Sequence, residues 1–386
     1  MQSDNNKEPA AMRRRGPGIA SSGLSAVVLL GVAATVLTSC GKESPSLGGR
    51  SDTAATTNAS ALPSGELAYV TNEDSQDLTV IDTRTDSVVA TIPVGTRPRG
   101  VRVAPDGNTV FVALSGSPKC PPTMPDEECE KLKVDKTKDG IAAVDVATGK
   151  VTRVLPGGSD PETFDLSTDG STLFVSNEDV DSASVVDVAS GKVRLAVPVG
   201  REPEGVRLQP DGSAVWITGE TDHNLTLLDT KTGKVLGHID VGKRPRDLAF
   251  SPDGNRAYAT AEVDGTVWVI DVPSRKVLKV IKLPKDSKPM GVVVSPDGKR
   301  VYVANGRGGT ISAIDAATNE VTNTIPVGQR PWGIAITSDG SKLYTANGPS
   351  NDVTVVDAQK MQVIKKIPAG KIPWGVAISR NSPSAS

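Results

Sequence analysis

Seven proline-centred segments recur along this chain of 386 residues and constrain its fold more than any other feature. In segments such as QRPWGIAITSDG (329–340) and KRPRDLAFSPDG (243–254), the proline precedes a short apolar run that ends at an Asp-Gly turn. The steps between successive prolines are 63, 42, 42, 44, 42 and 42 residues. A fixed period near 42 residues is typical of a repeat architecture. The shared prolines are Pro98, Pro161, Pro203, Pro245, Pro289, Pro331 and Pro373.

Each repeat contains four short runs with the pattern of β-strands. After the proline-led run come segments such as RVYVAN (300–305), TISAID (310–315) and VTNTIPVG (321–328). These runs are rich in β-branched residues and are bounded by Gly, Pro, Asp and Asn, which is the signal of strands and turns. Four strands per repeat favour the blade of a β-propeller.

The two ends of the repeat region complement each other. The region begins at ELAYVTN (66–72), which matches the second strand of a repeat, so the N-terminal part lacks an innermost strand. The last segment, Val376–Ser379 with its Pro-Trp-Gly entry, supplies that strand. The sequence therefore predicts an all-β fold, a seven-bladed β-propeller of four-stranded blades. Its ring is closed by a C-terminal strand that joins three N-terminal strands, which leaves no unpaired strand edge at the ends.

The repeat resembles that of the bacterial YVTN-repeat propellers. The residues that carry this resemblance are YVTNE (Tyr69–Glu73), YVANG (Tyr302–Gly306) and IPVG (Ile92–Gly95 and Ile325–Gly328), and it covers about residues 66–380. It implies a propeller from a family with cell-surface proteins, envelope proteins and a nucleic-acid binder. Related propellers form enzyme subunits in quinoprotein and haem systems. Because one fold hosts many activities, the resemblance leaves the function open.

The N-terminal residues predict an address in the cell envelope. Arg13–Arg15 precede a short apolar stretch, Leu24–Leu37, and the sequence Leu-Thr-Ser-Cys ends at Cys40. This order is typical of a secretory signal, and its end resembles the lipobox of bacterial lipoproteins. We expect a signal peptide over 1–39, lipidation of Cys40, a flexible tether over 40–65, the propeller over 66–380 and a tail over 381–386. The expected location is the bacterial cell envelope, with a lipid anchor in the membrane and the propeller periplasmic or surface-facing. The alternative is an ordinary signal or anchor helix in which Cys40 is incidental.

An insertion lengthens the first repeat by 21 residues. It covers about residues 115–139 and contains both remaining cysteines, Cys120 and Cys129. In an exported protein such a pair favours a disulfide. A metal pair is the alternative, although no histidine or third cysteine lies near, and we expect no metal and no cofactor. The insertion connects the second and third strands of its blade, which places it at one end of the channel as a lid or docking element.

That end of the channel, which we call the channel mouth, has varied residues around the shared prolines. Pure structural repeats would not need this variety, so the mouth is the candidate site for a polar ligand or partner. The alternative is that opposite charges simply pair around the rim. Loops between second and third strands add Glu73, Glu178, Glu220 and Glu262. The candidate binding residues are Arg97, Arg99, Glu162, Glu204, Arg246, Arg330, Trp332 and Trp374.

Three functions are compatible with these residues. The first hypothesis is a non-enzymatic propeller lipoprotein, expected to be a monomer, that binds a protein or small polar ligand at the channel mouth without catalytic residues. The second is an enzyme or accessory subunit of a periplasmic oxidation system, either quinoprotein-associated or lactonase-like, with Glu204 and Arg246 as candidates and His223 in reserve. The third is nucleic-acid binding through the mouth arginines and tryptophans. A formal net charge of −2 argues against that third partner.

Overall fold

The computed structural model describes residues 62–119, 124–129 and 131–379. These residues belong to two units. The first unit is the propeller, which contains residues 62–119 and 132–379. The second unit contains the helix α1 (Asp126–Cys129). The predictions for residues 1–61 and for Cys120 lie outside the described residues, as does the side chain of Cys129. Within the described ranges, no helix has the length and apolar character needed to cross a membrane.

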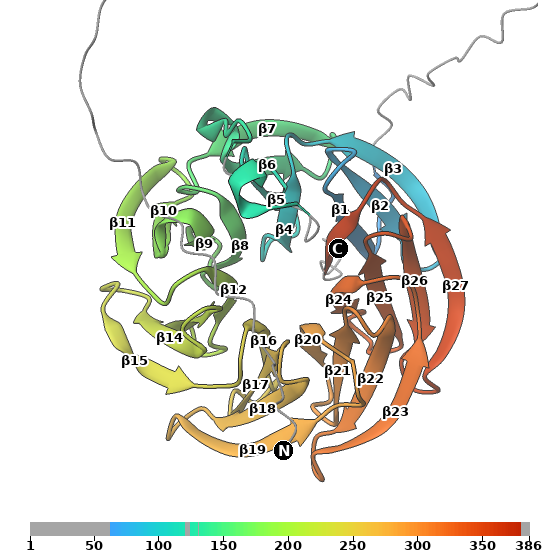
Figure 1. The fold of residues 1–386 in the computed structure, drawn as a ribbon. Coiled ribbons are helices and arrows are strands. Elements are labelled where there is room, and N and C mark those ends of the chain that lie inside the picture. Colours follow the sequence, from blue (N-terminus) through green and yellow to red (C-terminus); the bar gives the residue numbers. More distant parts are fainter. Residues whose placement is uncertain (1–61, 120–123, 130, 380–386) are drawn as a thin grey trace, which may run out of the picture. The chain divides into compact units, whose positions relative to one another are not determined.

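The propeller unit is a ring of seven four-stranded antiparallel sheets, as predicted (Figure 1). The blades are numbered from the first complete repeat. Blade 1 consists of β4 (Pro98–Val103), β5 (Thr109–Leu114), β6 (Gly140–Asp145) and β7 (Lys150–Leu155), and blade 2 of β8 (Pro161–Leu166), β9 (Thr172–Asn177), β10 (Ser182–Asp187) and β11 (Lys192–Pro198). Blade 3 consists of β12 (Pro203–Leu208), β13 (Ala214–Gly219), β14 (Asn224–Asp229) and β15 (Val235–Asp240). Blade 4 consists of β16 (Pro245–Phe250), β17 (Arg256–Ala261), β18 (Thr266–Asp271) and β19 (Lys276–Lys282). Blade 5 consists of β20 (Pro289–Val294), β21 (Arg300–Asn305), β22 (Thr310–Asp315) and β23 (Glu320–Pro326). Blade 6 consists of β24 (Pro331–Ile336), β25 (Lys342–Asn347), β26 (Asp352–Asp357) and β27 (Gln362–Pro368).

Blade 7 closes the ring with strands from both ends of the sequence. It has the order β28 (Pro373–Ile378), β1 (Leu67–Asn72), β2 (Asp77–Asp82) and β3 (Ser87–Pro93). In its register Tyr69 pairs with Ala377 and Val70 pairs with Val376. The innermost strand of this blade is therefore the C-terminal one, which confirms the predicted closure. Two 3-10 helices, η1 (Lys136–Lys138) and η2 (Glu178–Val180), lie in connections.

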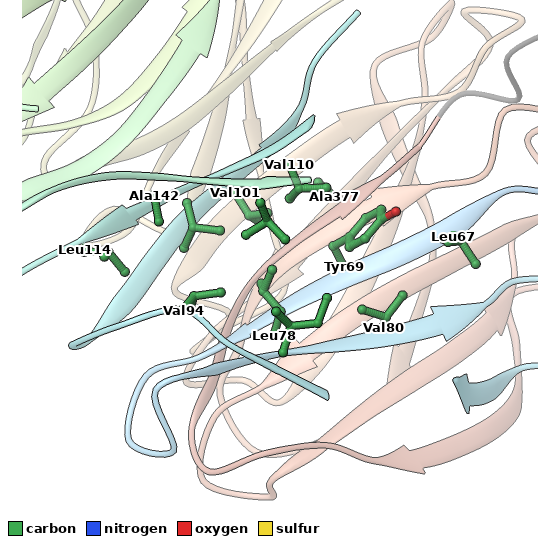
Figure 2. Close-up of a cluster of buried hydrophobic side chains, with 13 residues drawn as sticks. Leu67, Tyr69, Leu78, Val80, Val94, Val101, Val110, Leu114, Ala142 and Ala377 are labelled. Atoms are coloured by element: carbon green, nitrogen blue, oxygen red, sulfur yellow. The ribbon is translucent and has the colours of Figure 1, made fainter. Parts of the chain in front are cut away.

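Side chains of neighbouring blades form the hydrophobic core. In the cluster between blades 7 and 1, Tyr69 and Val80 of blade 7 lie with Val101 and Val110 of blade 1 (Figure 2). Tyr69 is 1% exposed and Val110 is fully buried. Because each blade buries one face of its sheet against the next, the core is a chain of inter-blade layers around the ring.

The innermost strands approach one another so closely that most carry glycine two residues after the shared proline. A Cβ atom on Gly100 would lie 2.8 Å from the Glu162 carbonyl oxygen, and one on Gly205 would lie 2.6 Å from that of Arg246. Contacts this short are not tolerated, so these glycines let the inner strands meet around the channel. At the same position blade 2 has Thr163 and blade 4 has Asp247, both of which enter the site.

Candidate functional site

The residue before each shared proline has a left-handed backbone conformation at the channel mouth. The seven φ angles lie between 48° and 60°, and one belongs to the β-branched Ile372. Non-glycine residues adopt this conformation at a cost, and it recurs at functional sites. The strained residues are Arg97, Asp160, Glu202, Arg244, Lys288, Arg330 and Ile372.

The first charged cluster at the mouth surrounds Arg99 of β4. Its guanidinium donates to Asp160 Oδ1 at 2.7 Å, forms an ion pair with Glu162, and lies 3.4 Å from Glu178 Oε2. Arg99 is 3% exposed and Glu162 is 4% exposed. Burial opposes ionisation of Asp160, but the charges of Arg99 and Arg97 and the hydrogen bond from Ser115 together outweigh it and hold the pKa of Asp160 below its usual value. Burial raises the pKa of Glu178, which is the outermost carboxyl of the cluster.

The second charged cluster surrounds Arg246 of β16. Arg246 Nη1 donates to Glu204 Oε2 at 2.6 Å and also to Glu220, while its Nε lies 3.3 Å from Glu262 Oε2. Arg244 forms a second ion pair with Glu220. Three carboxyl groups from blades 3 and 4 therefore converge on one buried guanidinium, whose fork geometry suits several carboxylates.

The two carboxyl groups that share Arg246 have opposite pKa shifts. Burial raises the pKa of Glu204 well above its usual value despite the charge of Arg246. Burial also acts on Glu220, but Arg246 and Arg244 outweigh it and lower its pKa. Glu204 therefore keeps its proton to higher pH than Glu220 does. Adjacent carboxyls whose pKa values are pushed apart are the arrangement found in acid–base catalysis.

The opposite side of the mouth is apolar. The indole rings of Trp332 (β24) and Trp374 (β28) stack with centroids 5.8 Å apart and an interplanar angle of 28°. The Arg330 guanidinium lies 4.4 Å from the Trp332 ring centroid, a cation–π distance. Burial lowers the pKa of Arg330, and neighbouring arginines add to the effect. Among the arginines predicted as binding residues, Arg330 forms no ion pair with the described part of the chain, whereas Arg97, Arg99 and Arg246 do.

A cavity of about 60 Å³ lies among the inner strands and joins the two sides. Its lining includes Glu204 and Arg246 of the second cluster, the two stacked tryptophans and Met290. Further along the inner strands it is lined by charged residues that face the channel: Arg102, Arg207 and Asp247. Arg207 Nη2 donates to Asp247 Oδ2 at 2.8 Å. Burial raises the pKa of Asp247 to about 7.

The structure brings together most of the residues predicted from the sequence. Arg99 and Glu162 form one cluster, Glu204 and Arg246 form another, and Trp332, Trp374 and Arg330 form the apolar side. Arg97 lies at the edge, where it donates to Glu73 Oε1 at 2.7 Å and to the Ser117 carbonyl at 3.0 Å. The expected alternative, charge pairing around the rim, describes the pairs correctly, but it does not account for the tryptophan side or the cavity.

Sequence reasoning missed the channel layer of Arg102, Asp165, Arg207 and Asp247. The signal was present, because Arg102, Asp165 and Arg207 all occur four residues after a shared proline, where the other blades have alanine or valine. Asp247 stands where most blades have glycine.

The connection between β5 and β6 comprises residues 115–139, the segment expected to be inserted. Its two ends contact each other and the mouth: Gly116 N donates to Asp139 Oδ1 at 2.6 Å, and Lys136 forms an ion pair with Asp179 of blade 2. The lid function and the disulfide stay predictions. His223, the reserve candidate, is a loop residue whose Nδ1 lies 2.9 Å from the Glu220 carbonyl oxygen. Among the described residues no group of three or more His, Cys, Asp or Glu could hold a metal ion.

The sequence that forms this propeller matches a known protein family. The family described as Lactonase, 7-bladed beta-propeller matches residues 58–206 and 230–366. The chain belongs to this family. The finer resemblance to YVTN-repeat propellers stays a prediction. A comparison with curated proteins finds no match.

Solved structures share the fold at low sequence identity. Hydrazine synthase of Kuenenia stuttgartiensis is 22% identical with a TM-score of 0.62, over 72% of this chain and 88% of that one. A "putative 6-phosphogluconolactonase" of Bacteroides fragilis is 18% identical with a TM-score of 0.66, over 84% and 99%. Another so described, from Bacteroides uniformis, is 19% identical with a TM-score of 0.65, over 81% and 99%. At these identities the likeness shows the fold alone.

Proposed function

We propose that this protein hydrolyses a lactone, a cyclic ester, at its channel mouth. One observation carries the proposal: Glu204 and Glu220 share the Arg246 guanidinium while their pKa values move in opposite directions. Membership of the lactonase propeller family supports it. The lactonase-like alternative therefore takes precedence over the main expectation from the sequence, which was binding without catalysis.

In this proposal each group has a role. The Glu220 carboxylate takes a proton from water as the water oxygen attacks the lactone carbonyl carbon. The Arg246 guanidinium stabilises the negative charge that develops on the carbonyl oxygen. The carbon–oxygen bond of the ring then breaks, and Glu204 gives its proton to the leaving ring oxygen. The two carboxyls afterwards exchange the proton through solvent, which restores the starting state.

The first prediction is the loss of lactone hydrolysis when Glu220 is neutralised. Glu220→Gln removes the base and should lower kcat by about 10²–10⁴-fold, measured by pH-stat titration of the acid released from a δ-lactone. The rate of the unmodified protein should be bell-shaped in pH, because it needs Glu220 ionised and Glu204 protonated. Asp222→Asn is the matched control, since Asp222 lies in the same loop and pairs with the exposed Arg201.

An unchanged rate in Glu220→Gln, or no turnover of any lactone by the unmodified protein, would refute the proposal. The second candidate function is then binding without turnover. The Trp332–Trp374 stack under the Arg330 guanidinium favours it, because this is a preformed aromatic surface for a polar ligand or partner. A partner captured from envelope extract by the unmodified protein, but lost in a variant with Arg99→Glu and Trp332→Ala, would support that candidate.

A further inference from the structure

The outer surface of the ring carries most of the exposed apolar side chains. It is formed by the outermost strand of each blade, namely β3, β7, β11, β15, β19, β23 and β27 (Figure 1). Of the 15 large hydrophobic side chains that are exposed in the described ranges, 12 belong to these strands. Lysine on an outer strand protects its unpaired edge from pairing with other chains. Such protection does not account for valine and leucine side chains that face solvent.

Strand β19 of blade 4 differs from the other outer strands in its charge. Its sequence KVLKVIK contains three exposed lysines and no acidic residue, whereas the other six outer strands contain at most two cationic residues each. These lysines form no ion pair with the described part of the chain. They are Lys276, Lys279 and Lys282. Between them lie the exposed apolar side chains of Val277, Leu278 and Val280.

A tryptophan lies behind this strand. Trp268 of β18 pairs with Val280, and the other blades have Ser, Thr or Ala at its position. On the neighbouring outer strand, β15 of blade 3, Gly237 pairs with Leu227, which belongs to the core cluster that Trp268 packs against. A Cβ atom on Gly237 would meet no atom within 4 Å, so this side of the groove between the two blades is open. Trp268 is half-buried there.

We infer that this surface binds a membrane that contains anionic lipids. Lysines attract the negatively charged headgroups, while aliphatic and tryptophan side chains enter the boundary between headgroups and acyl chains. An acidic protein would also attract the lysines, but lysine is depleted in protein interfaces. Lysine and tryptophan together are typical of a membrane boundary. The β19 surface is defined as Trp268, Lys276, Val277, Leu278, Lys279, Val280 and Lys282.

The β19 surface would orient the propeller at a membrane and would not hold it there alone. Stable attachment takes two signals, and a few lysines with short apolar side chains provide one reversible signal. The predicted lipid at Cys40 would be the other. As a flexible tether, the 22-residue step from Cys40 to Leu62 would have a root-mean-square length of about 25 Å, which keeps the propeller close to the bilayer. This inference goes beyond the proposed hydrolysis and does not depend on it.

The test measures how strongly the full chain with Cys40→Ser, which cannot carry the lipid, binds to vesicles. One preparation contains phosphatidylcholine alone, and the other contains phosphatidylcholine mixed with phosphatidylserine. We expect tighter binding to the anionic vesicles, and this preference should fall as salt rises because salt screens the lysines. Residues 1–61 are the same in every variant, so a difference between variants reports on the substituted surface.

Replacing all three β19 lysines by glutamine should weaken binding to the anionic vesicles by about 100-fold. Each lysine near an anionic surface contributes about 1 kcal/mol, and 1.4 kcal/mol is a factor of ten. The matched control removes the same charge from the outer strands of blades 1, 2 and 6, and it should bind nearly as well as the unsubstituted protein. Its substitutions are Lys150→Gln, Lys192→Gln and Lys366→Gln.

The apolar contribution has its own pair of variants. Leu278→Ala should weaken binding about fivefold to tenfold, because it removes side-chain carbons that would leave water at the membrane. Val154→Ala on β7 is the control, since Leu278 and Val154 are both 54% exposed. It should leave binding unchanged. Circular dichroism checks that each variant is folded.

Brominated lipids show which face of the propeller touches the membrane, because they quench tryptophans that contact them. Trp216 is fully buried in the core, and Trp332 and Trp374 belong to the channel mouth. Quenching in anionic vesicles should therefore disappear in Trp268→Phe, which keeps an aromatic ring. Quenching that persists in this variant would place another face on the membrane and overturn the inference.

Two further results would also overturn it. Equal binding to both vesicle preparations, or equal losses in the two triple-lysine variants, would show that β19 does not recognise anionic lipid. Poly-L-glutamate that displaces the protein from vesicles as effectively as phosphatidylserine vesicles of equal charge would instead indicate an acidic protein as the partner.

Discussion

At the scale of single residues, the site is governed by competition between burial and charge pairing. Arg99 and Arg246 are buried guanidiniums, and each is compensated by more than one carboxylate. Burying a charge is tolerated only when it is paired and hydrogen-bonded. Where partners suffice, as for Glu220, the pKa falls; where burial dominates, as for Glu204 and Asp247, it rises.

Asp247 offers a direct measure of that competition. Its pKa is raised from 3.8 to about 7 in the folded state, so the unfolded chain releases this proton at lower pH than the folded protein. The stabilisation linked to its proton is complete below about pH 4 and is lost as pH rises through about 7. Relative to Asp247→Asn, the unmodified protein should lose about 2–4 kcal/mol of unfolding free energy between pH 4 and pH 8.

The measurement for Asp247 is chemical unfolding of both proteins across that pH range. Asn mimics the protonated acid, so the two proteins should be nearly equally stable at pH 4. A gain of stability by the unmodified protein toward pH 8 would contradict the expectation. It would mean that the Arg207 ion pair at 2.8 Å outweighs burial.

At the scale of elements, the critical feature is the junction between blade 6 and blade 7. Asp86, in the β2–β3 turn, accepts from Lys342 Nζ at 2.8 Å and from the Tyr344 hydroxyl, both on β25 of blade 6. Glu66, directly before β1, accepts from Ser338 N at 2.8 Å. These contacts add polar links across the junction, where the closing blade is built from two distant parts of the chain.

Asp86→Ala should destabilise the propeller because it leaves Lys342 and the buried Tyr344 hydroxyl without their carboxylate. We expect a loss of about 2–4 kcal/mol in urea-induced unfolding, the range for removing one partner of a largely buried pair. Asn319→Ala is the matched control: Asn319 occupies the corresponding turn of blade 5 and has φ 59°, against 51° for Asp86. Both variants strain the backbone alike, so equal losses would show that the pair contributes nothing.

At the scale of the whole molecule, a nearly symmetric ring carries an asymmetric site. The charged inner-strand residues belong to blades 1 to 4, and Met290, Trp332 and Trp374 belong to blades 5 to 7. The repeat supplies seven equivalent positions around one channel, and substitution at those positions makes one side polar and the other apolar. A ligand with a charged end and an apolar face would fit both sides at once.

The address of the molecule is a prediction from its N-terminal residues alone. We propose that Cys40 carries lipid and holds the propeller at a membrane, since acyl chains contribute about 0.8 kcal/mol per buried CH₂. In a bacterial host, the full chain should incorporate a labelled fatty acid and sediment with membranes, and Cys40→Ser should abolish both. Membrane sedimentation that persists without label would instead indicate an uncleaved anchor helix.

The sequence by itself determined the architecture of this protein. The 42-residue period, the four strand-like runs per repeat and the complementary ends specify a seven-bladed ring, because strand alternation and turn chemistry are local properties. The same periodicity placed Arg99, Glu204, Arg246, Trp332 and Trp374 at one channel mouth. The tertiary structure decided which of these residues touch, because the distance between side chains of neighbouring blades depends on how closely the inner strands approach. It alone revealed that Glu204 and Glu220 share Arg246, and that Arg207 pairs with Asp247.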